Sequence, residues 1–337
     1  MELWQLKQMQ SLPLEAKIVK SQLRIKEWYD YWNGQVYVSF SGGKDSTVLL
    51  HLVRSMYPNV PAVFADTGLE YPEIKEFVRS TKNVTIIRPE MTFKSVIEKY
   101  GYPVISKRQA RYIREARTTN SEYLYRLRTE GIKRDGSIAS YAKISDKWLY
   151  LIDAPFKIDD KCCYVMKKRP FTIYERETGR RPYIGTMASE GRTRELNWLQ
   201  HSCNAFDLKR PTSQPISFWL EEDIWDYLKR YNIPYSKIYD MGWERTGCMW
   251  CAFGVHLEDE PNRFQRMAKT HPKLYEYCMK PASEGGLGLA EVLDYIGVDY
   301  EFRGEQLTLD LRDVQGGEDI PWHGLNRTRV CRGTEKH

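Results

Sequence analysis

Short apolar runs alternate with segments of helical hydrophobic spacing in the first quarter of the chain. Strands are predicted where β-branched and aromatic residues run together, at 36–40, 61–66 and 83–88. Helices are predicted where apolar positions recur every three or four residues, at 47–53 and 73–79. This βαβαβ alternation predicts an α/β fold with a doubly wound, mostly parallel sheet and helices on both faces.

The remaining pattern is mainly helical. Residues 1–30 carry apolar side chains at helical spacing among Lys, Gln and Glu, and two further helices are predicted at 215–228 and 290–296. In the first of these, the inward positions are expected to be Trp219, Ile224, Trp225 and Leu228. We therefore expect an N-terminal helical segment (1–30), a main α/β domain (31–260) and a helical or irregular C-terminal extension (261–337).

Composition narrows the class of protein. The 337 residues include 42% hydrophobic and 28% charged residues, which is typical of a globular protein. No apolar run is long enough to span a membrane and no signal segment is visible, so a cytoplasmic location without a membrane partner is expected. Seven cysteines without a secretory signal favour metal or redox chemistry over a disulfide framework.

A glycine pair interrupts the chain between the first predicted strand and helix. Gly42 and Gly43 let the backbone turn tightly, so that N–H groups and the positive end of the next helix converge on an anion. Lys44 adds a positive charge, and hydroxyl groups come from Ser41, Ser46 and Thr47. The pattern therefore indicates a phosphate site, although a glycine turn capped by Asp45 would also fit it.

A second carboxylate follows the second predicted strand. Because the carboxyl ends of parallel strands face one crevice, Asp66 is expected near the glycine turn. Asp45 and Asp66 together would suit Mg²⁺ held against a polyphosphate. Ser39 and Phe64, near the ends of the two strands, are assigned to the same nucleotide site. An isolated strand-end acid can also be an ordinary turn residue.

Basic residues gather between positions 107 and 134, where nine Lys and Arg side chains accompany three acids and three tyrosines. Such a run is either a solvated helix face or a surface that binds a phosphate backbone. Both interpretations stay open, and the second makes a nucleic acid a candidate partner.

The cysteines fall into two close pairs, Cys162-Cys163 and Cys248-Met-Trp-Cys251. Adjacent cysteines do not suit a single tetrahedral zinc ion, whereas the iron corners of an iron–sulfur cube lie further apart and can accept neighbouring thiolates. A structural zinc site or reduced buried thiols remain the alternatives. Cys203 and Cys278 have no partner at ligand spacing and are predicted to be core residues.

Several motifs carry a resemblance to known families. The segment Ser41-Gly-Gly-Lys-Asp-Ser46 resembles the PP-loop of the ATP pyrophosphatase superfamily, whose fold is HUP-like, and Asp66-Thr-Gly-Leu-Glu-Tyr-Pro-Glu73 resembles an element of phosphoadenosine phosphosulfate (PAPS) and adenosine phosphosulfate (APS) reductases. The two cysteine pairs, the stretch 182–194 and the stretch 215–239 are similar to further parts of that reductase family. The resemblance covers roughly residues 35–256.

This resemblance implies specific roles. It makes Cys162, Cys163, Cys248 and Cys251 the ligands of a [4Fe–4S] cluster in a helical and loop region. It also gives catalytic roles beside the nucleotide to Lys44, Asp45, Asp66, Arg192 and Arg194. Guanidinium groups suit phosphate and sulfate, which agrees with the two arginines.

The resemblance leaves three functions open. A complete PP-loop favours ATP, cleaved to AMP and pyrophosphate by an adenylating enzyme similar to the ATP pyrophosphatases of DNA phosphorothioation and tRNA thiolation, with a sulfur-donor or modification-complex protein as partner. The second is a reductase of PAPS or APS, but the reductases end in Glu-Cys-Gly-Leu-His, whereas the late cysteine here, Cys331, lies in a different setting. The third is a nucleotide- and cluster-binding subunit or sensor without catalysis.

Overall fold

The main sheet is built around strand β1 (Val36–Ser39), whose side chains are almost entirely buried. The structure is a computed structural model that describes residues 1–302, and these form one compact unit. The strands of this sheet run in the order β3-β2-β1-β5-β7-β6. The other five are β2 (Ala62–Ala65), β3 (Val84–Ile87), β5 (Arg181–Ile184), β6 (Asn204–Ala205) and β7 (Thr212–Ser213).

Neighbouring strands are parallel except for β6, which runs antiparallel to β7. The predicted doubly wound, mostly parallel α/β sheet is therefore confirmed. In the register, Val38 of β1 lies between Ala62 of β2 and Tyr183 of β5. The chain thus fills the sheet from β1 to β3 on one side and adds β5 on the other side of β1, and in such sheets ligands bind in the crevice beyond the strand ends at this switch point.

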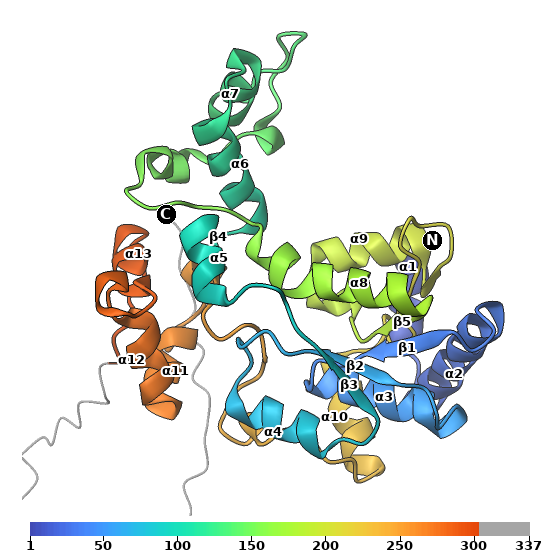
Figure 1. Ribbon diagram of the computed structural model, residues 1–337. Helices are drawn as coiled ribbons and strands as arrows, with labels where there is room; N and C mark the ends of the chain where they lie inside the picture. Colours follow the sequence, from blue (N-terminus) through green and yellow to red (C-terminus); the bar gives the residue numbers. More distant parts are fainter. Residues whose placement is uncertain (303–337) are drawn as a thin grey trace, which may run out of the picture. The chain divides into compact units, whose positions relative to one another are not determined.

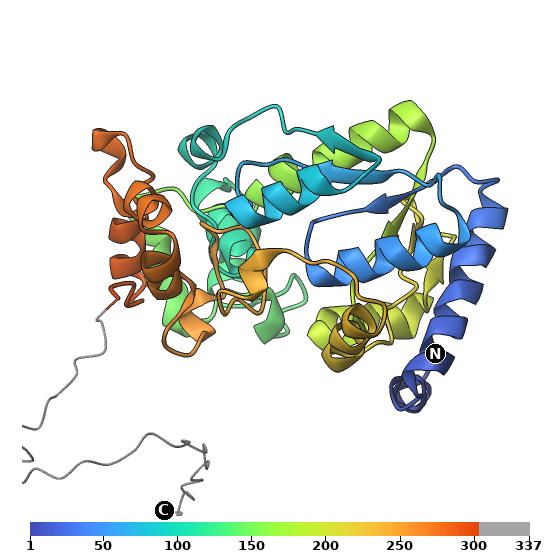
Figure 2. The same ribbon diagram turned by 90° about the horizontal axis from the view of Figure 1, so that it is seen from below.

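Helices cover both faces of the sheet, as Figures 1 and 2 show. Helices α3 and α4 lie on one face, and α8 lies on the opposite face. The helices that surround the sheet are α1 (Leu3–Gln10), α2 (Leu14–Tyr31), α3 (Lys44–Met56), α4 (Pro72–Ser80), α8 (Arg169–Thr178), α9 (Arg192–His201) and α10 (Glu221–Arg230). A buried ion pair of 2.6 Å between Lys17 and Asp223 ties α2 to α10.

The helix predicted at 215–228 begins later than expected. Residues 215–218 form a turn, and α10 starts at Glu221 because the carboxylate of Asp223 accepts the Leu220 N–H at 2.7 Å. Trp219 is nevertheless buried, and its indole N–H donates to Ser21 Oγ at 2.9 Å. Trp225, also expected to point inward, is only partly buried, and Lys44 Nζ lies 6.0 Å from the centre of its ring.

A second, two-stranded sheet joins distant parts of the chain. Strand β4 (Val104–Ile105) pairs in parallel with β8 (Ala252–Phe253), which directly follows Cys251. Around it lie α5 (Phe93–Lys99) and the C-terminal helices α11 (Arg263–Thr270), α12 (Pro272–Met279) and α13 (Leu289–Tyr295). The predicted helix 290–296 corresponds to α13.

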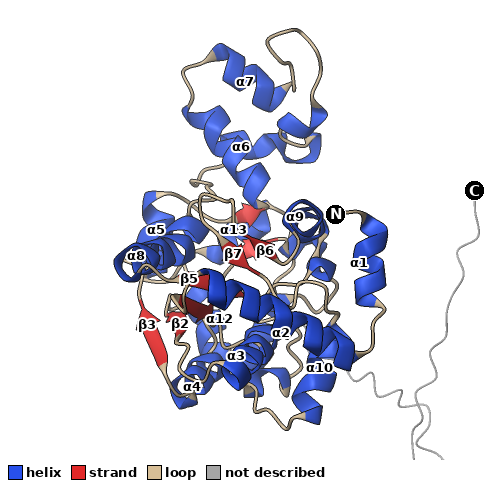
Figure 3. Cartoon of the chain, turned by 90° about the vertical axis from the view of Figure 1, so that its right-hand side faces the viewer, coloured by secondary structure: helices blue, strands red, loops and turns tan. Residues whose placement is uncertain are grey.

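Residues 107–153, which we call the basic arm, stand away from the main sheet (Figures 1 and 3). Serine side chains start both of its α-helices: Ser106 accepts a hydrogen bond from Gln109 N, and Ser121 accepts one from Leu124 N. The arm contains α6 (Lys107–Thr118), α7 (Glu122–Thr129), η1 (Ser140–Ala142) and η2 (Asp146–Asp153). No described helix is both long enough and apolar enough to cross a membrane.

Candidate active site

The glycine turn lies at the carboxyl end of β1, as the sequence predicts. Gly42 has φ +74°, and a Cβ atom there would lie 2.8 Å from Val78 Cγ2 and 2.9 Å from Ile74 Cγ2 of α4. Only glycine therefore fits the turn without displacing α4. Gly43 is the N-cap of α3 and has no side chain to cap it, although Tyr239 accepts the Lys44 N–H at 2.8 Å. The start of α3 is suited to an anion.

The hydroxyl groups of the turn hold the loop in shape. Ser41 Oγ and Ser46 Oγ lie 3.1 Å apart, and Ser46 Oγ also accepts the Ser41 N–H at 3.2 Å. The hydroxyls of Ser46 and Thr47 donate to the Gly43 carbonyl at 2.9 and 3.0 Å. The loop conformation is thus fixed by its own side chains.

Lys44 is buried beside this loop, and Asp45 is partly buried, with 23% of its side chain exposed. Lys44 Nζ lies 3.2 Å from Glu221 Oε1, donates to the Glu244 carbonyl at 3.2 Å, and is 3.8 Å from Asp45 Oδ1. Asp45 Oδ1 is buried and accepts no hydrogen bond from any described residue. Burial raises the pKa of Asp45, the negative charges of Glu190 and Glu221 raise it further, and Lys44 acts in the opposite direction. A buried carboxylate oxygen that accepts no hydrogen bond and has only a long ion pair with Lys44 suits a divalent cation.

Asp66 has other partners. It forms ion pairs with Lys75 at 3.1 Å and Arg88 at 3.4 Å. Burial acts to raise the pKa of Asp66, but the hydrogen bond and charge of Lys75, together with Arg88, lower it overall. The charged groups that influence Asp45 are Lys44, Glu190 and Glu221, so the two carboxylates have different charged surroundings, and magnesium binding by the pair stays a prediction. Among residues 1–302, no three His, Cys, Asp or Glu side chains surround a single ion.

The other predicted nucleotide residues lie close by or in the sheet. Ser39 ends β1, and Phe64 is buried in β2. After β5, a Cβ on Gly185 would lie 3.1 Å from the Asp45 carbonyl, which shows how closely this loop approaches α3. The loop then leads into the short helix η4 (Ala188–Glu190) and the start of α9.

Arg192 and Arg194 open α9 and line a cavity of about 270 Å³ together with Glu190 and Arg245. Arg192 is highly exposed and donates to Glu195 at 3.0 Å, while Arg194 pairs with Glu190. Since Glu190 also influences Asp45, the arginine cavity and the PP-loop share a neighbour. The arginine cavity and the PP-loop are therefore both accessible to one anionic ligand in the crevice.

The four cysteines of the two pairs come together in the fold. Cys162 and Cys163 precede η3 (Tyr164–Lys168), while Cys248 and Cys251 precede β8. Burial raises the pKa of Cys162, and the other three thiols raise it further; burial and Cys248 raise the pKa of Cys251 to about 11. The thiols therefore lie within electrostatic range of one another.

A buried lysine accompanies these thiols. Lys167 contacts Cys248, whose negative charge is the main cause that raises the pKa of this lysine. Cys162 is buried and the other three thiols are partly buried, and four thiols that would repel one another as thiolates suit a positively charged iron–sulfur core. Cys203 and Cys278 are buried in the core, as predicted.

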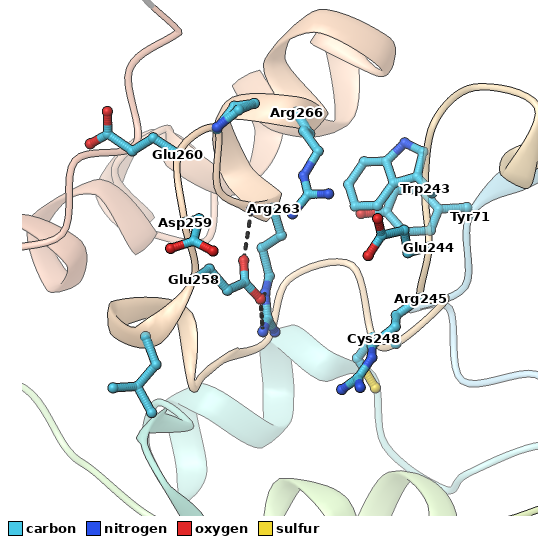
Figure 4. Close-up of a pocket in the computed structure, with 13 residues that line it drawn as sticks. Tyr71, Trp243, Glu244, Arg245, Cys248, Glu258, Asp259, Glu260, Arg263 and Arg266 are labelled. Atoms are coloured by element: carbon cyan, nitrogen blue, oxygen red, sulfur yellow. Dashed lines mark hydrogen bonds and ion pairs between the residues drawn. The ribbon is translucent and has the colours of Figure 1, made fainter. Parts of the chain in front are cut away.

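The largest described cavity beside the cysteines was not anticipated from the sequence. It measures about 740 Å³ and has Cys248, Arg245 and Tyr71 in its wall. Arg263 and Arg266, both labelled in Figure 4, also line this cavity. Arg263 is fixed by an ion pair with Glu258 and donates to the Cys251 carbonyl at 2.8 Å. In the sequence, the one sign of these cavity-lining arginines is that two arginines lie three residues apart after the second cysteine pair.

One cation of this cavity lacks a complete set of partners. Arg266 lies 5.8 Å from the ring of Trp243, and its Nε is buried without a hydrogen-bond acceptor among the described residues. Arg245 lines both this cavity and the cavity of Arg192 and Arg194. An anionic substrate that reaches from the nucleotide site to Cys248 would therefore meet cationic side chains along its way.

These features define an α/β protein whose sheet presents a PP-loop at its switch point, beside a cluster of four thiols. The family model "Phosphoadenosine phosphosulfate reductase domain" matches residues 35–126 and 127–253, which is more than half of the chain. The chain belongs to this family.

Individual relatives are distant. An uncharacterized protein of Methanocaldococcus jannaschii is 24% identical over 282 residues, covering 81% of this chain and 54% of the relative. The adenosine 5'-phosphosulfate reductase of Anoxybacillus flavithermus is 23% identical, covering 82% of this chain and 98% of the relative. The chain spans about half the length of the two Methanocaldococcus jannaschii proteins that it matches.

Among solved structures, the U34-tRNA thiolase NcsA from Methanococcus maripaludis with its [4Fe–4S] cluster has a TM-score of 0.35 and 16% identity, covering 86% of this chain and 84% of that one. Cys331, the late cysteine compared with that of the reductases, lies outside the described residues.

Proposed function

We propose that this protein is an ATP-dependent adenylating enzyme of sulfur metabolism or nucleic-acid sulfur modification, which cleaves ATP to AMP and pyrophosphate. The observation that carries the proposal is Asp45, a partly buried carboxylate at the start of α3 whose buried Oδ1 accepts no hydrogen bond from a described residue and lies 3.8 Å from Lys44 Nζ. Magnesium is commonly held by one or two carboxylates together with phosphate oxygens. ATP brings a Mg²⁺-bound triphosphate to this position, whereas a sulfonucleotide lacks the β and γ phosphates.

The reaction assigns a task to each part of the site. An acceptor oxygen attacks the α-phosphorus of ATP, the bond from that phosphorus to the bridging oxygen of the β-phosphate breaks, and pyrophosphate leaves. Asp45 would hold the Mg²⁺ that offsets the charge of the phosphates. The N–H groups at the start of α3 hold the departing phosphates, and Arg192 and Arg194 neutralise negative charge near the α-phosphate. A sulfur nucleophile, brought by a donor protein, then attacks the acceptor carbon and displaces AMP.

The cysteines have a separate place in this scheme. Cys162, Cys163, Cys248 and Cys251 would hold a [4Fe–4S] cluster, which would act structurally when all four thiolates bind it, or would offer an open iron for sulfur if one cysteine is not a ligand. Lys167 balances the charge of the buried thiolates. The cavity next to Cys248 is lined by residues that can bind the anionic acceptor, among them Arg245, Arg263 and Arg266.

The test offers the purified protein ATP labelled in the α-phosphate and, separately, PAPS or APS. Release of pyrophosphate and labelled AMP from ATP is the expected result, and sulfite without pyrophosphate would overturn the proposal. Asp45→Asn should remove Mg²⁺-dependent cleavage, whereas Asp207→Asn, an exposed acid away from the site, should leave it unchanged.

A reductase of PAPS or APS is the second candidate, and the family match favours it. In that reaction a cysteine thiolate attacks the sulfur of the sulfonucleotide and the nucleotide leaves. Cys331→Ser should then abolish sulfite formation, but it should leave pyrophosphate release intact if the first proposal is correct. Binding of ATP without either product would indicate a non-catalytic subunit or sensor.

A further inference from the structure

The basic arm holds nearly all of the excess positive charge of the chain. The whole sequence has 51 Lys and Arg against 45 Asp and Glu. Residues 107–153 contain eleven of these basic residues and six of the acidic ones, so the arm accounts for five of the six excess positive charges. Charge concentrated on a protruding element is the electrostatic pattern of a surface that meets a polyanion.

Part of this charge is used inside the arm. Arg114 pairs with Asp159 at 3.3 Å, and Arg128 pairs with Glu115 at 2.6 Å. Arg117 donates to the carbonyls of Ala154 and Phe156 at 3.0 and 2.7 Å. These three arginines hold α6 to its neighbours and are not available to a ligand.

Other cations of the arm face outward. Lys107, Arg108 and Arg111 are exposed, and none forms an ion pair with a described residue. At about 100° per residue, their positions lie within roughly 100° of one another around α6. The sequence alone did not distinguish these three residues from the internal arginines, and the structure does.

Aromatic side chains accompany the outward cations. Tyr125 on α7 is 46% exposed, and Tyr141 on η1 is 68% exposed. The Arg134 guanidinium lies 4.9 Å from the ring of Tyr123. Exposed aromatic rings beside cations are suited to stacking with unpaired bases while the cations contact the phosphates.

The base of the arm lies next to the cysteines. Strand β4 leads directly into α6, pairs with β8 immediately after Cys251, and its Ile105 carbonyl accepts the Gly254 N–H at 2.8 Å. On the C-terminal side of the arm, Asp159 forms an ion pair with Arg114 and lies three residues before Cys162. A strand bound along the arm would therefore lead toward the thiol cluster and its cavity.

We propose that the basic arm is a binding surface for single-stranded nucleic acid, which lies across Lys107, Arg108 and Arg111 and stacks bases on Tyr125 and Tyr141. The arm thereby supplies the acceptor class for the reaction proposed above, and in that respect it rests on the proposed function. The binding itself does not require ATP. The tyrosines favour unpaired bases, because the bases of a duplex are already stacked on one another.

The test measures anisotropy of fluorescent single-stranded DNA and RNA oligonucleotides, and of a duplex, at several salt concentrations without ATP. The variant Lys107→Gln/Arg108→Gln/Arg111→Gln should bind at least tenfold more weakly, and the slope of log K against log salt should fall by about 2 for three lost phosphate contacts. Tyr125→Ala/Tyr141→Ala should weaken binding at least fivefold, with the slope unchanged. Preference for RNA or DNA identifies the acceptor.

The control removes the same charge elsewhere. Lys20→Gln/Arg79→Gln/Arg176→Gln changes three exposed residues on α2, α4 and α8 and should retain binding. Equal losses in both triple variants, stronger binding to duplex than to single strands, or binding to anionic phospholipid vesicles but not to oligonucleotides would each overturn the proposal. Pyrophosphate release is scored separately, so a failure of the arm and a failure of the ATP reaction are distinguishable.

Discussion

Replacing Gly42 by alanine tests how closely the PP-loop packs against α4. Gly42 and Gly179 have nearly the same left-handed backbone, with φ +74° and +71°. A Cβ on Gly179 would meet nothing within 4 Å, whereas a Cβ on Gly42 would lie 2.8 and 2.9 Å from two methyl groups of α4. The two substitutions therefore share the backbone effect and differ in the steric one.

The magnitudes follow from this difference. A left-handed conformation costs alanine about 1–2 kcal/mol, and the less flexible unfolded chain returns about 0.4–1 kcal/mol. Gly179→Ala should thus lower the free energy of unfolding by about 1 kcal/mol or less. Overpacking adds about 1–3 kcal/mol for Gly42→Ala, which should lose about 2–4 kcal/mol in all.

Urea denaturation followed by tryptophan fluorescence measures both variants. Because α4 and the loop must move apart, Gly42→Ala should also weaken ATP binding, while Gly179→Ala should not. Equal losses of stability in the two variants would refute the packing described here. Unchanged ATP binding in a folded Gly42→Ala protein would show that the loop does not hold the nucleotide.

Three further predictions concern buried groups. Asp45→Asn should raise the free energy of unfolding of the nucleotide-free protein by about 1 kcal/mol in urea titrations, because burial and the negative charges of Glu190 and Glu221 disfavour the carboxylate more than Lys44 stabilises it; a loss of stability would show that the ion pair with Lys44 outweighs them. Burial raises the pKa of Cys278 to about 12, so this thiol should resist alkylation at pH 8 in the native protein, as mass spectrometry can show. Because its folded pKa is above its unfolded one, its contribution to stability is complete below about pH 8.5 and falls by about 1.4 kcal/mol per pH unit as the pH rises toward 12. Glu175→Ala should lower the free energy of unfolding by about 2–3 kcal/mol, since it removes the acceptor of Tyr37 and Arg210 at 2.6–2.7 Å; a loss below 1 kcal/mol in urea titrations would refute this.

The sequence alone determined the local parts of the fold. The strand, glycine turn and helix around residues 36–53 follow from β-branched runs, from residues that permit tight turns and from helical spacing, all of which act over a few neighbouring residues. The later start of α10 was missed because a side-chain cap at Asp223, and not hydrophobic spacing, sets its first residue. Strands β6 and β7, the last two of the main sheet on one side, have two residues each, too few for any periodic pattern.

Only the tertiary structure decided which charged and polar groups meet. It paired Asp66 with Lys75 and Arg88, left Asp45 Oδ1 without a hydrogen bond, and separated the internal arginines of the arm from Lys107 and its outward neighbours. The pairing of β4 with β8 placed the arm beside Cys251 across nearly 150 residues of sequence. Such contacts join segments that no local pattern relates, because they depend on how buried surfaces and charges are satisfied once the whole sheet has formed.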